Sequence, residues 1–292
     1  MDKTDPLQKN ANHSHIHTLV EKNIISYDLY HRALDLAGIR PDKAQWKQFI
    51  ELVFASLGAG FLLFGILSFF AYNWVGLAPI YKFLIIQSLI VASVIAALLK
   101  PADTLFRKLA LTAASVFTGI FLAIYGQVYQ TGADRYQLFL TWSLLISGWV
   151  IISRFSALWF FWILLINLSI TLFIDQTYDT ELKGAYMLAF ILVPINALFL
   201  ITAEWRYLKE VQEDASPWLL YALLITTLVS LTGATLIITQ ISNELIIYLF
   251  YIAIIVPLYW YYYRRKNLFA MTLCHLSTGF AATNFLIIYF TI

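Results

Sequence analysis

The sequence predicts an all-α, polytopic integral membrane protein with about nine transmembrane helices. Of its 292 residues, 61% are hydrophobic and only 12% are charged, and the mean hydropathy is +0.74. A soluble domain has roughly 45–50% apolar and about 25% charged residues. The apolar residues also form long runs without Asp, Glu, Lys or Arg, and a membrane helix needs about 20 such residues. These runs lack the alternation of barrel strands, which leaves helices as the structure that is stable across lipid.

Two regions follow from the positions of these runs. Residues 1–48 are expected to form a short cytosolic helical region, in which Ser26 can cap a helix that ends before Gly38. Residues 49–292 are expected to form the transmembrane helix bundle. The expected spans are approximately 52–72, 83–99, 109–125, 138–152, 157–174, 185–203, 217–240, 245–263 and 268–290.

The distribution of basic residues predicts how the chain crosses the membrane. With the N-terminus in the cytoplasm, 16 of the 19 Lys and Arg residues lie on the cytoplasmic side. Basic residues are enriched in cytoplasmic loops, so this orientation is strongly favoured over its inverse. An odd number of spans then places the C-terminus on the outer side.

Several classes of function are disfavoured by composition and motifs. The formal charge of +2 and the absence of a basic stripe argue against nucleic-acid binding. The single Cys274 excludes an internal disulfide. No GxSxG, HExxH or P-loop motif is present, and the sequence predicts no catalytic residue, cofactor or metal ligand set. Whether the alternating His13, His15 and His17 bind a metal ion remains open, because no Cys or carboxylate completes a site nearby.

The predicted spans contain no Asp, Glu, Lys or Arg in their interior, whereas ion-coupled transporters usually keep a buried ionisable group. Other residues are candidates for a conduit. Pro194 and Pro257 occupy similar positions in the sixth and eighth spans, and paired interruptions of this kind indicate a transport site. Asn196 lies near the first proline. Thr232 and Thr235 share one face of the seventh span, where hydroxyl groups serve either a polar conduit or helix packing.

Residues 124–139, IYGQVYQTGADRYQLF, separate two apolar runs and are predicted to lie outside. We expect Gly126 to Gln137 to form an ordered cap on the outer surface, packed against the turn that follows the first span. In this cap, glutamine side chains would bond backbone groups freed at span ends, and an Asp–Arg pair would point outward. The candidate partner- or ligand-binding residues are Asn73, Trp74, Gln127, Tyr129, Gln130, Asp134 and Arg135.

The stretch GQVYQTGADRYQLFLTW at 126–142, preceded by AYNW at 71–74, resembles a bacterial membrane protein family called domain of unknown function 2157. The resemblance extends over approximately residues 18–175. It implies a multi-pass protein of the bacterial inner membrane with no established activity. Members are often encoded beside another multi-span protein and a smaller membrane-anchored protein, which suggests a membrane complex.

Three functions are compatible with these features. The favoured one is a non-enzymatic subunit of a bacterial envelope membrane complex that docks partners through its outer loops. Its expected partners are membrane lipids and other integral or membrane-anchored envelope proteins. The alternative is a transporter or flippase for a lipid or amphipathic solute. A second alternative is an outer-leaflet enzyme that uses external carboxylates, either Asp134 or the pair Asp175 and Asp179.

Overall fold

The computed structural model describes residues 13–290 except 23, 37–42, 74–75, 131, 179, 209–215 and 243–244. Within these residues it contains eleven α-helices and no strand. The predicted all-α fold is therefore confirmed. The chain divides into two compact units, Met1–Ala71 and Tyr72–Ile292, and each is described by itself.

The first unit contains a pair of short helices and most of a long one. α1 (His13–Glu21) and α2 (Tyr27–Leu36) pack against each other. Ile16 and Leu34 are both 4% exposed, so one apolar side chain from each helix is buried. α3 (Lys43–Asn73) continues without interruption through residue 48, the end of the predicted cytosolic region, so the charged approach and the first span form one helix.

Nine helices within the described residues are long and apolar enough to cross a membrane, which confirms the predicted number. Their limits extend beyond the charge-free runs at most ends, because helical hydrogen bonding continues through flanking polar residues. They are α3, α4 (Pro79–Leu98), α5 (Leu105–Tyr129), α6 (Arg135–Ser153), α7 (Ser156–Thr177), α8 (Glu181–Leu208), α9 (Pro217–Ser242), α10 (Ile246–Arg264) and α11 (Leu268–Phe290).

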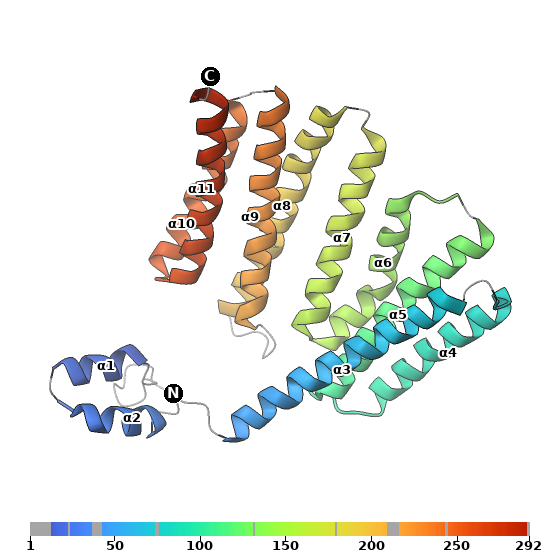
Figure 1. The fold of residues 1–292 in the computed structure, drawn as a ribbon, viewed down its shortest axis with the longest axis horizontal. Helices are drawn as coiled ribbons and strands as arrows, with labels where there is room; N and C mark the ends of the chain where they lie inside the picture. The colour runs from blue at the N-terminus through green and yellow to red at the C-terminus, as the bar shows by residue number, and fades with distance from the viewer. Residues whose placement is uncertain are drawn as a thin grey trace. The chain divides into compact units, whose positions relative to one another are not determined.

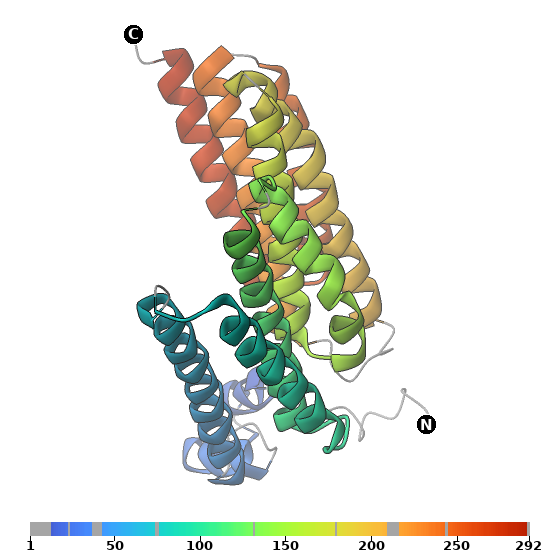
Figure 2. The same cartoon turned by 90° about the vertical axis from the view of Figure 1, so that its right-hand side faces the viewer.

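In the second unit, α9 is the central helix of the C-terminal part. It contacts α7, α8, α10 and α11, and Figures 1 and 2 show α8 to α11 lying side by side with nearly parallel axes. The buried core of this part includes Val193, Leu224 and Leu231. α4 packs on α5, α5 on α6, and α6 on α7, so neighbouring helices in the sequence are neighbours in space.

The connection between α6 and α7 shows how the chain reverses within a few residues. Arg154 adopts the left-handed conformation, with φ 46°, directly after α6. Phe155 is extended, and the backbone N–H groups of Leu158 and Trp159 donate to its carbonyl oxygen, 3.0 Å away in both cases. α6 and α7 thus form the close helical hairpin that the short connection predicts.

Of the charged residues that lie inside the described helices but outside the predicted spans, two are buried. Lys82 belongs to α4 and is 6% exposed, and Glu204 belongs to α8 and is 8% exposed. The predicted spans themselves contain no Asp, Glu, Lys or Arg, but the helices that include them extend over these two buried charges. Each residue directly flanks a predicted span, and the helix simply continues past the end of the apolar run.

Candidate functional site

The segment that carries the family resemblance forms a tight turn between two helices. α5 continues through Gly126 and ends at Tyr129, and α6 begins at Arg135. Gln130 then takes the left-handed conformation with φ 44°, and Gly132 has φ 60°, a region that glycine enters without the steric cost of a side chain. Most of residues 126–137 therefore lengthen the two helices, and the loop expected over this whole segment is restricted to the short turn between them.

A cavity of about 1010 Å³ lies beneath this turn, between α5, α6 and α7. Leucine side chains from all three helices, among them Leu122, Leu138 and Leu168, form its apolar part. Polar residues border it on the side of the turn: Gln127, Gln130, Asp134, Arg135 and Gln137. The site is therefore amphipathic. Four of these five polar residues, all except Gln137, were proposed from the sequence, whereas the proposed Tyr129 does not line the cavity.

Contacts across the turn fasten the start of α6 to the end of α7. Nη2 of Arg135 lies 3.2 Å from Oδ2 of Asp175, and both side chains are largely exposed, at 70% and 63%. The Gln176 amide donates to Oδ1 of Asp134. Ser169 also donates to the carbonyl oxygen of Tyr136, at 3.2 Å. The acidic and basic residues of the turn therefore have partners on α7, and Asp134 and Asp175 come to the same end of the bundle.

Two of the three glutamines of the cavity border lack the hydrogen bonds that the sequence predicts. Gln127 and Gln130 are exposed, and within the part of the chain that the structure describes, neither side-chain amide has a hydrogen-bond partner. The expected bonds to freed backbone groups are absent there. Tyr129 stacks on Phe83, with ring centroids 5.9 Å apart. The turn after the first span cannot be compared with the prediction, because Trp74 and the side chain of Asn73 lie outside the described residues.

A buried group of amides joins α7, α8 and α9. Asn167 and Asn196 exchange two side-chain hydrogen bonds of 2.9 and 2.8 Å. Asn196, with an exposed fraction of 0%, also donates to Ser230 at 2.9 Å. Pro194 lies within α8, two residues before Asn196. Asn196, considered for a conduit, is thus bonded on two sides by neighbouring helices. Asn167 was not identified from the sequence, although an amide inside an apolar run is a recognisable signal.

A second buried group joins α9, α10 and α11. Hydroxyls of Thr232 and Tyr251 lie 2.7 and 2.6 Å from that of Ser277. Nearer the end of α9, Asn284 donates to Thr239 at 2.7 Å and to Tyr248 at 3.0 Å.

The two remaining residues considered for a conduit also lie in these helices. Thr235 is fully buried and donates to the carbonyl oxygen of Leu231 at 2.8 Å. Pro257 lies within α10, which continues on both sides of it. Whether any of these residues serves transport stays a hypothesis.

Glu204 is the centre of a third polar cluster, which sequence reasoning missed. Tyr261 and Tyr262 of α10 donate to its two carboxylate oxygens at 3.0 and 2.9 Å. Nη1 of Arg265 lies 3.8 Å from Oε2. The available signal was the run of three tyrosines followed by two arginines at the end of α10, which suits a carboxylate on a neighbouring helix at the membrane edge.

No group of three or more His, Cys, Asp or Glu side chains in the described residues is arranged to hold a metal ion. His17 Nδ1 lies 3.4 Å from Oε1 of Glu21. The side chains of His13 and His15 lie outside the described residues, so metal binding by the three histidines stays a hypothesis.

The helices and their apolar surfaces define a multi-span α-helical membrane protein. Residues 17–159 match the model of the family described as "Predicted membrane protein (DUF2157)", so this region of the chain is similar to that family. The resemblance inferred from the sequence is thereby confirmed. Neither the curated proteins nor the solved structures contain a match to this chain.

Proposed function

We propose that this protein is a non-enzymatic subunit of a bacterial inner-membrane complex, and that the cavity beneath the α5–α6 turn receives the end of a partner's transmembrane helix. The supporting observation is the combination of an apolar interior with a border of exposed glutamine amides. A helix end presents apolar side chains together with backbone N–H or C=O groups that lack intrahelical partners. A glutamine amide offers both donors and acceptors, so it suits either kind of helix end.

The charges around the cavity favour a polypeptide over an anionic lipid headgroup. Asp134 and Asp175 carry two negative charges, and the guanidinium of Arg135 is already within 3.2 Å of Asp175. A phosphate group would meet a border with more negative than positive charge. The side-chain amides of Gln127 and Gln130 are neutral, and neither has a hydrogen-bond partner among the described residues.

The proposed orientation has the N-terminus in the cytoplasm and the C-terminus in the periplasm, which places the α5–α6 turn outside. Its support is the excess of basic residues on the cytoplasmic side. A Cys274→Ser background leaves no other thiol, so single cysteines can be introduced at Asp103, between α4 and α5, and at Thr180, between α7 and α8. An impermeant maleimide added to intact spheroplasts is expected to label position 180 and to spare position 103. Labelling of both positions from one side would contradict the orientation.

Site-specific photo-crosslinking in intact membranes tests the docking site. A benzophenone side chain at Gln130 is expected to yield a discrete adduct with an integral or membrane-anchored envelope protein. The same probe at Val229, which is 65% exposed on α9, serves as a lipid-facing control. The adduct at Gln130 should disappear in the Gln127→Ala variant, and tagging the identified partner should recover this chain. If position 130 yields only lipid adducts, the docking proposal is wrong and the lipid-transport alternative gains support.

A further inference from the structure

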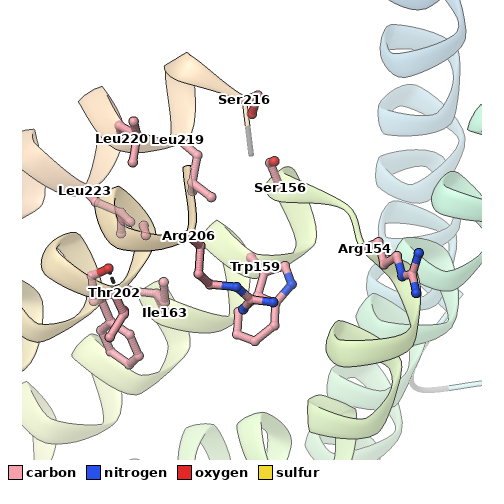
Figure 3. Close-up of a pocket in the computed structure, with 12 residues that line it drawn as sticks. Arg154, Ser156, Trp159, Ile163, Thr202, Arg206, Ser216, Leu219, Leu220 and Leu223 are labelled. Carbon is pink, nitrogen blue, oxygen red and sulfur yellow. Dashed lines mark hydrogen bonds between the residues drawn. The ribbon is translucent and has the colours of Figure 1, made fainter. Parts of the chain in front are cut away.

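A second cavity lies at the end of α7 that is opposite the α5–α6 turn. It has a volume of about 90 Å³, which is room for several water-sized groups, because one water needs roughly 10–15 Å³ by this measure. Figure 3 shows residues that line it. The polar lining residues are Arg154, Ser156, Thr202, Arg206 and Ser216, and apolar side chains such as Trp159, Ile163 and Leu223 complete the wall.

Positive electrostatic potential converges on this cavity from three elements. α7 begins at Ser156 and α9 begins directly after Ser216, and both serines line the cavity. The N-terminus of a helix carries a partial positive charge and N–H groups without intrahelical partners. Arg206, from the last turn of α8, adds a full positive charge. Among the described residues, all three elements favour an anion over a cation in this space.

The side chains show which lining groups face the space and which do not. In Figure 3, the guanidinium of Arg206 lies beside the indole of Trp159, whereas the side chain of Arg154 points away from the other labelled residues. Within the described part of the chain, Arg206 forms no ion pair. Thr202 donates to the carbonyl oxygen of Phe199 at 2.9 Å, so its hydroxyl proton is already used.

Ser216 supplies an independent indication that a ligand binds here, because this side chain lacks a partner. Its Oγ is buried and has no hydrogen-bond partner among the described residues. A buried hydroxyl without a partner costs free energy, and a bound group that carries acceptor oxygens would remove that cost.

We propose that this cavity binds a phosphate group. A guanidinium pairs with two phosphate oxygens at once, and the N-termini of α7 and α9 favour the same negative charge. In Figure 3 the Arg206 guanidinium lies beside Trp159 and not beside Ser216, so this side chain must turn toward Ser216 for the serine hydroxyl to donate to the same phosphate. The cavity lies where three membrane helices end, so the phosphate belongs either to a lipid headgroup or to a soluble phosphate ester. This site is separate from the proposed docking cavity, and neither proposal depends on the other.

Binding to the full-length protein in mild detergent distinguishes the two sources. We expect dioleoyl phosphatidylglycerol to bind in native mass spectrometry and to raise the thermal unfolding temperature. Dioleoylglycerol has the same acyl chains without the phosphate and should do neither. Saturable stabilisation by inorganic phosphate to the same extent would support the site and assign a soluble source. Equal binding of both lipids, or binding of neither lipid nor phosphate, would overturn the proposal.

Variants test whether the binding occurs at this cavity. Arg206→Gln removes the charge-assisted pair and should weaken phosphatidylglycerol binding at least about tenfold. Arg264→Gln is the matched control, because Arg264 lies 4.2 Å over the ring of Trp260 at the end of α10 and does not line the cavity. Its affinity should equal that of the wild type. An equal loss in both variants would mean that surface charge alone attracts the lipid, which contradicts a specific site.

Ser216→Ala keeps the proposal testable if Arg206→Gln fails to fold. Without lipid, this variant should unfold at the same or a higher temperature than the wild type, because it removes a buried hydroxyl that has no partner in the described structure. With phosphatidylglycerol, it should bind more weakly than the wild type. Wild-type affinity in Ser216→Ala would overturn the role of this cavity.

Discussion

Between α5 and α7 the helices meet largely through aromatic side chains, whereas between α7 and α11 buried polar side chains join them. In the first region, Trp142 of α6 packs edge-on against Phe161 of α7, and Tyr136 of α6 against Phe173 of α7. An indole N–H group also joins two helices, since Trp142 of α6 donates to the carbonyl oxygen of Ser115 on α5 at 2.8 Å. In the second region, amides, hydroxyls and one carboxylate connect neighbouring helices.

The difference shows two ways to hold apolar helices together in a solvent that is itself apolar. Lipid gives little hydrophobic drive for one apolar helix to leave it for another, so association depends on close packing and on hydrogen bonds between helices. Aromatic packing requires matched shapes, and polar contacts require matched partners. The family match ends at residue 159, so most of the polar second region lies beyond it.

The largest effect is expected where a carboxylate is buried. Glu204→Ala leaves the hydroxyls of Tyr261 and Tyr262 without their acceptor and separates Arg265 from its partner. Stability should fall by about 3 kcal/mol, measured by thermal unfolding in detergent. Glu204→Gln keeps an acceptor oxygen and should lose less. An equal loss in both variants would show that the charge, and not the hydrogen bonding, matters.

The next largest loss of stability is expected at a close contact between two helices of the first region. A Cβ atom added to Gly119 on α5 would overlap the indole of Trp142 on α6. Gly119→Ala should therefore destabilise the protein by about 2 kcal/mol through overpacking. Gly233→Ala on α9 is the control, because a Cβ there meets no described atom within 4 Å. If both substitutions have the same effect, the close approach of α5 and α6 is not what limits stability.

Loss of one amide from the second region should cost somewhat less. Asn196→Leu removes the bonds that Asn196 makes with Asn167 and Ser230, which keep only their bonds to carbonyl oxygens of their own helices, and we expect a loss of about 1.5 kcal/mol. The double variant Asn167→Leu/Asn196→Leu removes both amides and should recover part of that loss. Unchanged stability in the single variant would mean that the polar contacts are not needed for packing here.

The smallest effect on stability is expected at the cavity border. Gln127 is exposed and has no hydrogen-bond partner in the described structure, so Gln127→Ala should change stability by no more than about 0.5 kcal/mol. The same variant is expected to lose the crosslink from position 130. A substantial loss of stability would instead indicate the structural capping role that the sequence alone suggested.

The fold class and the number of spans could be predicted from the sequence alone. A helix that is surrounded by lipid needs a long apolar run with few charged residues, and such runs can be recognised directly in the sequence. The ends of the helices were harder to predict. The Gly126–Tyr129 segment reads as a loop, yet it completes α5, because isolated glycines and glutamines do not end a helix when the backbone bonds continue. Glu204 was missed for a related reason. A carboxylate one residue past an apolar run looks solvated until Tyr261 and Tyr262 are placed beside it by α10.

The central position of α9 has a consequence for how the chain is made. The ribosome delivers α7 and α8 to the membrane before α9, but α11, which carries Ser277 and Asn284, comes last. Meanwhile, several hydroxyls of α9 already bond to their own helix: Thr227, Thr235 and Thr239 donate to carbonyl oxygens three or four residues earlier. Hydroxyls satisfied in this way lower the cost of a polar helix waiting in lipid. A nascent chain stopped before Leu268 should therefore integrate α9 but remain exposed to membrane proteases until its final helix arrives.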